Sequence, residues 1–144
     1  MEPMLPIVVR DANVADAAAV AHLLGELGYP VPIEEARSRL SRATNLVILA
    51  ESAGEALGLL ELTLQRQITH ARPLARVTAM VVRDSARRHG VGRRLMERAA
   101  DLARVEGCEG IELTSAIRPE REASHQFYEA LGYRRTSYRF WRQL

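Results

Sequence analysis

VVRDSARRHGVGRRL, residues 81–95, is the stretch of sequence that decides the fold of this chain. An apolar, β-prone run from Val77 to Val82 leads into it, and an amphipathic helical pattern follows it. A helix N-terminus offers unpaired backbone N–H groups and the positive end of a dipole to an anion. Glycines let these amides approach the anion, and arginines add charge-assisted donors. The stretch therefore predicts a pyrophosphate cradle at a strand-to-helix junction, built on Arg87, Arg88, Gly90 and Gly92.

The spacing within RRHGVG, residues 87–92, resembles the motif of one family. It is similar to the R/Q-x-x-G-x-G/A loop of the GNAT superfamily of N-acetyltransferases, where this loop holds the pyrophosphate of acetyl-CoA. The resemblance implies acetyl-CoA as the cosubstrate, bound by the end of the strand, the loop and the first helical turn. The residues so implied are Met80, Val81, Val82, Arg87, Arg88, His89, Gly90, Val91, Gly92 and Arg93. The alternative is an ordinary glycine-containing turn with solvated arginines.

A second motif, SHQFYEALGY, covers residues 124–133 and is similar to the GNAT signature A-x-x-F/L-Y-x-x-L-G-F. Phe127 and Leu131 are four residues apart and share one helical face, which indicates packing. Tyr128 aligns with the tyrosine that in the family protonates the departing thiolate of coenzyme A. A phenol with an ordinary pKa near 10 can act as such an acid. The alternative is a core tyrosine whose hydroxyl has a hydrogen-bond partner.

Two positions near this motif depart from the family pattern. Arg121 stands where the family often has Asn, and Ser124 replaces the usual Ala. The stretches LGYP, residues 27–30, and TSYRF, residues 136–140, are similar to a bacterial GNAT subgroup. That subgroup includes acetyltransferases of small amines such as aminoalkylphosphonates. A β-prone aromatic strand explains the second stretch equally well.

The general base is harder to assign. An amine must be neutral to attack a thioester, so its proton has to go to a carboxylate or to ordered water. Related chains often carry Glu on the strand before the cradle, but residues 76–80 contain no acid. Glu61 is the nearest substitute and shares a strand face with Leu59 and Thr63. It is either the base, directly or through water, or a solvated edge carboxylate. His125 could line the acceptor cleft, or lie on the solvated surface.

The periodicities predict an α/β fold with a mixed central sheet flanked by helices, in the order β-α-α-β-β-β-α-β-α-β. This order matches the GNAT fold, in which two parallel strands splay apart and pantetheine enters the gap like an added strand. Asp11 or Asn13 can cap the first helix, and Gly28-Tyr29-Pro30 ends it. The expected strands are Ile7–Arg10, Leu46–Glu51, Leu57–Leu64, Val77–Val82, Ile111–Thr114 and Tyr133–Trp141. The expected helices are Val14–Leu24, Ile33–Ala43, Val91–Glu106 and Glu122–Leu131.

Composition limits the class of protein. The chain has 144 residues, 47% of them apolar, with 20 basic and 18 acidic side chains, which favours a single globular domain spanning residues 1–144. No apolar run is long enough for a membrane helix, and no signal peptide is expected at the N-terminus. The one cysteine, Cys108, indicates a structural role and a cytoplasmic location. The four histidines show no metal-ligand spacing, and few aromatics accompany the arginines, so neither a metal nor nucleic acid is expected.

Together these features predict a cytoplasmic, acetyl-CoA-dependent N-acetyltransferase that transfers the acetyl group directly to the primary amine of a small molecule. A backbone N–H on the Val77–Val82 strand would polarise the thioester carbonyl. Two other interpretations stay open: a non-catalytic acyl-CoA-binding or regulatory module of the same fold, and a protein N-acetyltransferase. Loops 29–35 and 65–73 would select the acceptor, and two copies could pair as a homodimer.

Overall fold

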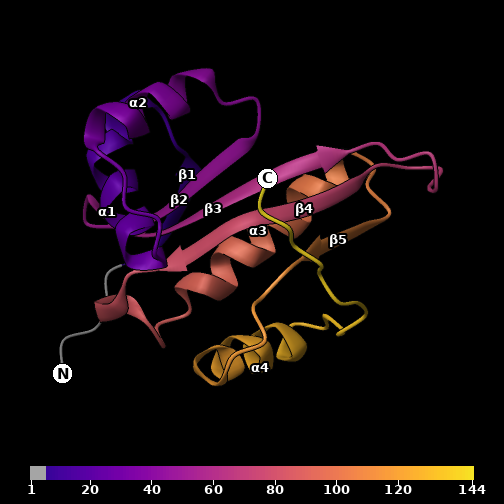
Figure 1. The fold of residues 1–144 in the computed structure, drawn as a ribbon. Coiled ribbons are helices and arrows are strands. Elements are labelled where there is room, and N and C mark those ends of the chain that lie inside the picture. The colour runs from indigo at the N-terminus through magenta and orange to yellow at the C-terminus, as the bar shows by residue number, and fades with distance from the viewer. Residues whose placement is uncertain (1–5) are drawn as a thin grey trace.

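The computed structural model describes residues 6–144 as a three-layer α/β/α arrangement (Figure 1). Residues 1–5, part of the stretch in which no signal peptide is expected, lie outside the described residues. The strands are β1 (Val8–Asp11), β2 (Leu46–Ser52), β3 (Glu55–Gln65), β4 (Leu74–Val82) and β5 (Gly110–Leu113). The helices are α1 (Ala17–Leu27), α2 (Ile33–Arg42), α3 (Val91–Val105) and α4 (Glu122–Ala130). Short 3-10 turns are η1 (Val14–Asp16), η2 (Asp84–Ala86) and η3 (Pro119–Arg121).

One mixed sheet joins the five strands in the order β1-β2-β3-β4-β5. The first three pairings are antiparallel and the β4–β5 pairing is parallel. The parallel pair is connected through α3, as a βαβ crossover requires. The expected mixed α/β sheet is therefore confirmed, with the cradle sequence at the end of β4.

The two faces of the sheet carry separate cores. On one face α1 and α2 pack over Leu49, Leu59 and Val81. On the other face α3 packs over a larger cluster that includes Ile48, Leu60 and several apolar residues of α3 itself. Apolar side chains recur at helical spacing along α3, so one stripe of that helix is buried while the opposite stripe carries arginines. Phe127, Tyr128, Leu131 and Tyr133 of the second motif border this larger cluster.

The 3-10 turn η1, which leads into α1, shows which of the two capping candidates is used. Asn13 accepts a hydrogen bond from the Ala15 N–H, and Asp16 accepts one from the Asn13 N–H, which completes a capping box. Asp16 also binds Arg10 of β1 through two hydrogen bonds of 2.8 and 2.9 Å. Arg10 in turn binds Glu51 of β2, so one guanidinium joins β1, η1 and β2. The helix ends at Gly28 in the left-handed conformation (φ 102°), as expected.

The predicted final strand is wrong. Residues 134–144 have no assigned secondary structure and do not pair with the sheet. Tyr138, Phe140 and Trp141 are more than 70% exposed, and the Arg139 guanidinium lies 4.9 Å from the centre of the Trp141 ring. Aromatic residues favour strands only where a partner strand is present, and this segment has none in the described chain. The sheet therefore ends at β5.

No helix in the part of the chain that the structure describes has the length and apolar content needed to cross a membrane.

Candidate active site

The loop after β4 delivers free backbone donors at the start of α3. Gly90 caps the helix in the left-handed conformation (φ 80°), and no side chain caps it. The first helical bond runs from the Arg94 N–H to the Gly90 carbonyl over 3.0 Å. The N–H groups of residues 91–93 precede this bond and have no partner among the described residues. The cradle sequence thus forms a helix N-terminus that can receive an anion.

The arginines around this helix start differ in their contacts. Arg87 forms a 3.3 Å ion pair with Asp84, and Arg93 donates to Glu97 one turn along the helix. Arg88 has no ion pair with any described residue, and its backbone is left-handed (φ 68°), which is uncommon outside glycine. Arg87, Arg88 and His89 are all exposed. Of these three arginines, Arg88 alone lacks a carboxylate partner among the described residues. The backbone N–H of Arg93 precedes the first helical bond and is free.

The two glycines of the motif are needed for different reasons. A Cβ built on Gly90 meets no atom within 4 Å, so the positive φ alone requires glycine there. A Cβ built on Gly92 would lie 3.2 Å from Cζ of Phe127, 3.5 Å from Val82 and 3.7 Å from Met80. Gly92 therefore lets α4 pack closely against the start of α3. Sequence reasoning assigned both glycines to the approach of a phosphate and missed this packing role.

Strands β4 and β5 separate beside the cradle. They pair only from Leu74↔Gly110 to Val77↔Leu113, and after this the chain turns away from β4 toward α4 (Figure 1). Backbone groups of residues 78–82 that point away from β3 have no strand partner among the described residues. An extended ligand could bond to this open edge as an added strand. Of the expected binding residues on this strand, Val81 is buried toward α1 and α2, so it offers only its backbone.

A bulge in β4 places Thr78, the first residue of this open edge, in contact with Glu61 of β3. Leu62 pairs with Val77 and Glu61 with Ala79, so Thr78 is an extra residue between two ladder positions. The Thr78 hydroxyl donates to Oε1 of Glu61 over 2.6 Å, and the Asn45 amide donates to Oε2 over 3.3 Å. Among the described residues no cation lies within ion-pair distance of the Glu61 carboxylate. Neutral donors thus orient Glu61 and leave its charge free for a ligand.

Tyr128 lies on α4 against the larger core cluster. Its ring makes edge-to-face contacts with Phe127, at 5.2 Å between centroids, and with Tyr133, at 6.2 Å. Burial raises the pKa of Tyr128 above its ordinary value, while the positive charge of Arg121 partly opposes this shift. None of the described residues forms a hydrogen bond with its hydroxyl, unlike the satisfied core tyrosine that was the alternative. The phenol therefore keeps its proton at neutral pH and is free to donate it.

His125 is not a solvated surface residue, which was one of its two alternatives. Its side chain is 12% exposed, and Nε2 lies 3.0 Å from the carbonyl oxygen of Ala116, in the segment that follows β5. Nδ1 is buried without a hydrogen bond, 3.6 Å from a carboxylate oxygen of Glu122. His125 thus ties α4 to the end of β5 and helps to hold the helix that carries Tyr128.

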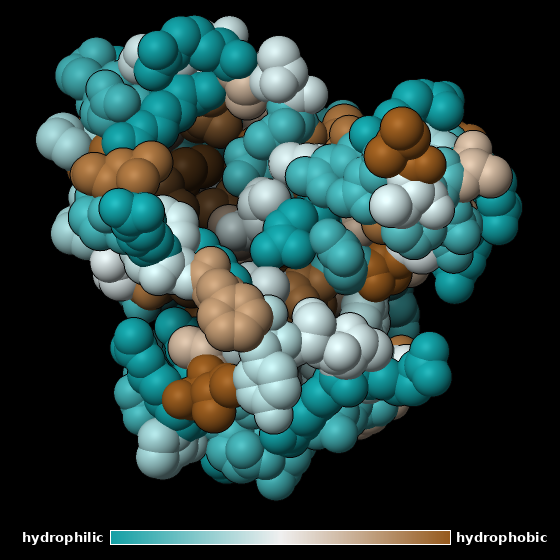
Figure 2. Space-filling view, turned by 45° about the vertical axis from the view of Figure 1, so that its right-hand side comes forward, coloured by the Kyte–Doolittle hydropathy of each residue, from teal (hydrophilic) through white to brown (hydrophobic). Residues whose placement is uncertain are grey.

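The surface seen in Figure 2 is hollowed in its upper left part, with hydrophobic residues on the floor and hydrophilic residues around the rim.

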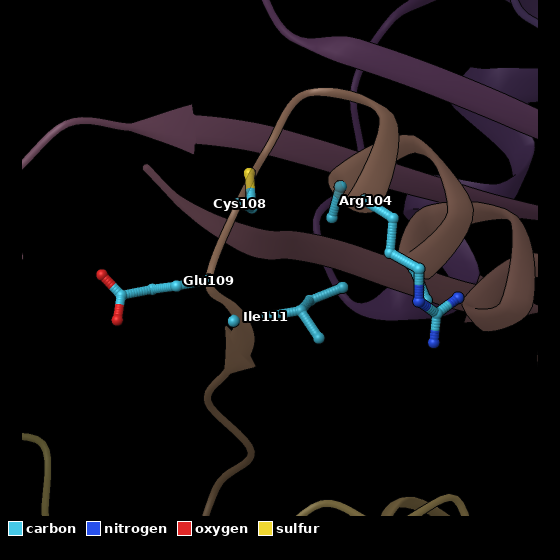
Figure 3. Close-up of a pocket in the computed structure, with 7 residues that line it drawn as sticks. Arg104, Cys108, Glu109 and Ile111 are labelled. Carbon is cyan, nitrogen blue, oxygen red and sulfur yellow. The ribbon is translucent and has the colours of Figure 1, made fainter. Parts of the chain in front are cut away.

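A separate hollow of about 190 Å³ lies between the last turns of α3 and the start of β5 (Figure 3). Cys108 lines it, Ile111 points toward α3, and Glu109 points to the other side of the strand. No cluster of three potential metal ligands occurs in the described residues. Neither of the two candidate catalytic residues, Glu61 and Tyr128, lines this hollow.

Comparison with known proteins agrees with this geometry. The sequence model of the Acetyltransferase (GNAT) family matches residues 17–133, most of the chain. This chain belongs to the GNAT acetyltransferase family. The matched segment runs from α1 through the cradle and β5 to Tyr133 at the end of the second motif.

Individual relatives support the family and the fold. An aminoalkylphosphonate N-acetyltransferase of Salmonella typhimurium is 29% identical, over 99% of this chain and 96% of that protein. An acetyltransferase structure from Trypanosoma brucei superposes with a TM-score of 0.81 at 24% identity, covering 96% of this chain and all of that one. A ribosomal-protein-alanine N-acetyltransferase from Brucella melitensis reaches 0.83 at 17% identity, over 96% and 99% of the two chains. At these identities the two structures show the fold alone.

Proposed function

We propose that this protein is an acetyl-CoA-dependent N-acetyltransferase that acetylates the primary amine of a small molecule. The observation that carries the proposal is Glu61, held by Thr78 at the β4 bulge, at the point where β4 loses its β5 neighbour. A carboxylate oriented by neutral donors beside an open strand edge is suited to accept a proton from an ammonium group. The relative that is 29% identical is named for an aminoalkylphosphonate acceptor, which is a small molecule with an amine. That name supports a small-molecule amine as the acceptor proposed here.

The residues present fit acetyl-CoA. The free N–H groups of residues 91–93 and the exposed guanidinium groups of Arg87 and Arg88 suit a pyrophosphate. The unpaired backbone edge of residues 78–82 suits the amides of pantetheine. When bound, acetyl-CoA supplies an activated acetyl thioester. The implied binding residues Met80, Val82 and His89 would contribute through the strand end and the loop that they belong to.

The proposed transfer is direct. Glu61, itself or through one water, removes a proton from the acceptor ammonium and so produces the neutral amine. The amine nitrogen then bonds to the acetyl carbon and loses its second proton to water, the carbon–sulfur bond breaks, and Tyr128 donates its proton to the leaving thiolate. Tyr128 regains a proton from water, and Glu61 releases its own, before the next turnover. An unpaired β4 N–H at residues 78–82 donates to the carbonyl oxygen while negative charge develops on it. No acyl-enzyme forms in this scheme.

A two-step experiment tests the proposal. Isothermal titration with acetyl-CoA should show binding, and release of free thiol should then be followed with a panel of primary amines. Because the chain contains no lysine, its side chains supply no competing primary amine. Binding with thiol release for at least one amine supports the proposal. Binding without acetylation of any small amine or peptide would favour the non-catalytic module, and acetylation of peptides alone would favour a protein N-acetyltransferase.

Two further proposals concern the setting of the enzyme. We place the reaction in the cytoplasm, because one cysteine in 144 residues fits a reducing compartment. We also propose a homodimer, supported by the exposed aromatic side chains of Tyr138, Phe140 and Trp141 next to a sheet that ends at β5. Sedimentation velocity should show a dimer for the natural chain and a monomer after Phe140→Ser and Trp141→Ser. A natural chain that sediments as a monomer would refute the dimer.

A further inference from the structure

Half of one sheet face is polar. Where α1 and α2 cover this face, it carries Leu49, Leu59 and Val81. Beyond Leu59 the same face of β3 continues with Glu61 and Thr63, and β4 continues with Thr78 and Arg76. Thr63 pairs directly with Arg76 across the two strands, and Arg76 pairs with Glu112 of β5. The uncovered part of the face is thus a polar surface beside the proposed transfer site.

Arg76 spans the point at which β4 and β5 begin to separate. Its Nη1 donates to Oε1 of Glu112 over 3.0 Å, and its Nη2 donates to the Thr114 hydroxyl over 3.4 Å. The side chain is 27% exposed, and Nε has no hydrogen-bond partner among the described residues. A guanidinium carries five N–H donors in a planar fork, so two bonds orient it and leave donors for an anion.

Two of the charged groups on this face, Glu61 and Arg76, are complementary to a small zwitterion. Glu61 lacks a cationic partner among the described residues, and Arg76 has unused donors. Glu61 is fixed at Thr78, two residues along β4 from Arg76, which corresponds to about 7 Å of extended backbone. An acceptor in which one or two carbons separate an ammonium from an anion can reach both groups from this face. Glu112 and Thr114 hold the guanidinium in place but do not use its remaining donors.

We propose that the acceptor is a small zwitterionic amine, whose ammonium binds Glu61 and whose carboxylate or phosphonate binds Arg76. This inference rests on the proposed function and names the substrate class for the same site. Arg76 acts here as a specificity-determining residue: it holds the anionic end while the amine reacts. A planar guanidinium can bind either anion, because a carboxylate and a phosphonate each offer two oxygens to its N–H donors.

Steady-state kinetics of three matched acceptors test the proposal: aminomethylphosphonate, glycine, and ethanolamine as the amine without an anion. The natural protein should favour the better of the two zwitterions over ethanolamine in kcat/KM, and the better one identifies the anion. Arg76→Gln should lower kcat/KM for that zwitterion about 10- to 100-fold, the range for a lost charge-assisted hydrogen bond, with most of the effect in KM. It should change ethanolamine less than about twofold, the scale of an altered surface residue.

Two variants serve as controls. Arg76→Lys keeps the positive charge and should retain part of the preference for the zwitterion over ethanolamine. This variant also tests the role of the charge if Arg76→Gln does not fold. Arg104→Gln removes an exposed arginine in the last turn of α3 and should leave all three acceptors unaffected. Equal losses for zwitterion and ethanolamine in Arg76→Gln would assign Arg76 a purely structural role and overturn the inference. A natural protein that acetylates ethanolamine as well as the zwitterions would overturn it while leaving the proposed function intact. Acetylation of no amine at all would overturn the proposed function itself.

Discussion

Alanine substitutions at Gly90 and Gly92 should separate the two roles of glycine in the cradle. At Gly90 the backbone is left-handed and a Cβ has open space, so the cost of Gly90→Ala is conformational. A non-glycine residue in this region costs about 1–2 kcal/mol. For a chain of this size the loss corresponds to a fall in Tm of roughly 3–8 °C. We expect this fall without a change in the packing of α4.

At Gly92 the balance is different. The residue lies in the first turn of α3 with ordinary helical geometry, where alanine gains about 1 kcal/mol of helix propensity over glycine. The new Cβ, however, would lie 3.2 Å from Cζ of Phe127, and overpacking of this kind costs about 1–3 kcal/mol. The free energy of unfolding should therefore fall by about 0–2 kcal/mol. The Phe127 ring must move, and Tyr128, whose ring centroid is 5.2 Å away, is next to it on α4. We therefore expect the main effect of Gly92→Ala to be a lower kcat, because the shift of Phe127 disturbs Tyr128.

Thermal unfolding and steady-state kinetics on the two variants check these expectations. The double variant Gly92→Ala with Phe127→Leu removes the ring atom that the Cβ would meet, so it should recover part of the lost turnover. An unchanged Tm in Gly90→Ala would refute the left-handed loop. Gly92→Ala with a raised Tm and natural kinetics would refute the close packing of α4 on α3.

Three other predictions follow from the site. Tyr128→Phe keeps the ring packing and removes the proton donor, so turnover should fall about 10- to 1,000-fold. The affinity for acetyl-CoA, measured by titration calorimetry, should stay the same. Unaltered turnover under conditions where chemistry limits the rate would remove Tyr128 from the mechanism. Glu61→Gln should lower the acetylation rate most at neutral pH. The rate of the variant should partly recover at high pH, where the acceptor amine is already neutral. If the pH–rate profiles of the variant and the natural protein superimpose, the general base is another group. Burial raises the pKa of both Tyr128 and Tyr133, so the folded state holds these protons to higher pH than the unfolded state does. The free energy of unfolding from urea titrations should therefore fall as the pH rises above 10, less steeply in Tyr128→Phe, and a flat dependence would contradict the burial.

Most of the fold could be predicted from the sequence, because the local sequence signals agree with one another. The β-prone run, the glycine turn and the amphipathic helix around Gly90 lie where they were expected. The bulge in β4 was not predictable. Ala75, Val77, Met80 and Val82 all face α3, and the spacing slips by one residue at Thr78. A small polar residue followed by alanine fits a strand on either face, so only the pairing with β3 reveals the slip.

The final segment failed as a strand for a related reason. Residues 133–141 have the aromatic and β-branched content of a strand, and the prediction used that content alone. A strand also needs a partner with free backbone groups, and pairing depends on where the chain goes after α4. Polar partners of the site were missed in the same way. Asn45 in the bend before β2 and Thr78 of β4 contact Glu61, and Glu112 of β5 contacts Arg76. No local sequence pattern predicts contacts between segments so far apart in the chain.

The position of Glu61 bears on how a missing motif residue should be interpreted. Residues 76–80 of β4 contain no acid, and this absence alone would favour a protein that binds acyl-CoA without turning it over. The β4 bulge instead turns Thr78 toward β3, where its hydroxyl holds a carboxylate that belongs to the neighbouring strand. An acid from β3 can thus contact Thr78, the residue of β4 at which the open edge begins. The chemical requirement is a carboxylate at that place in the sheet, and two adjacent strands can each supply it.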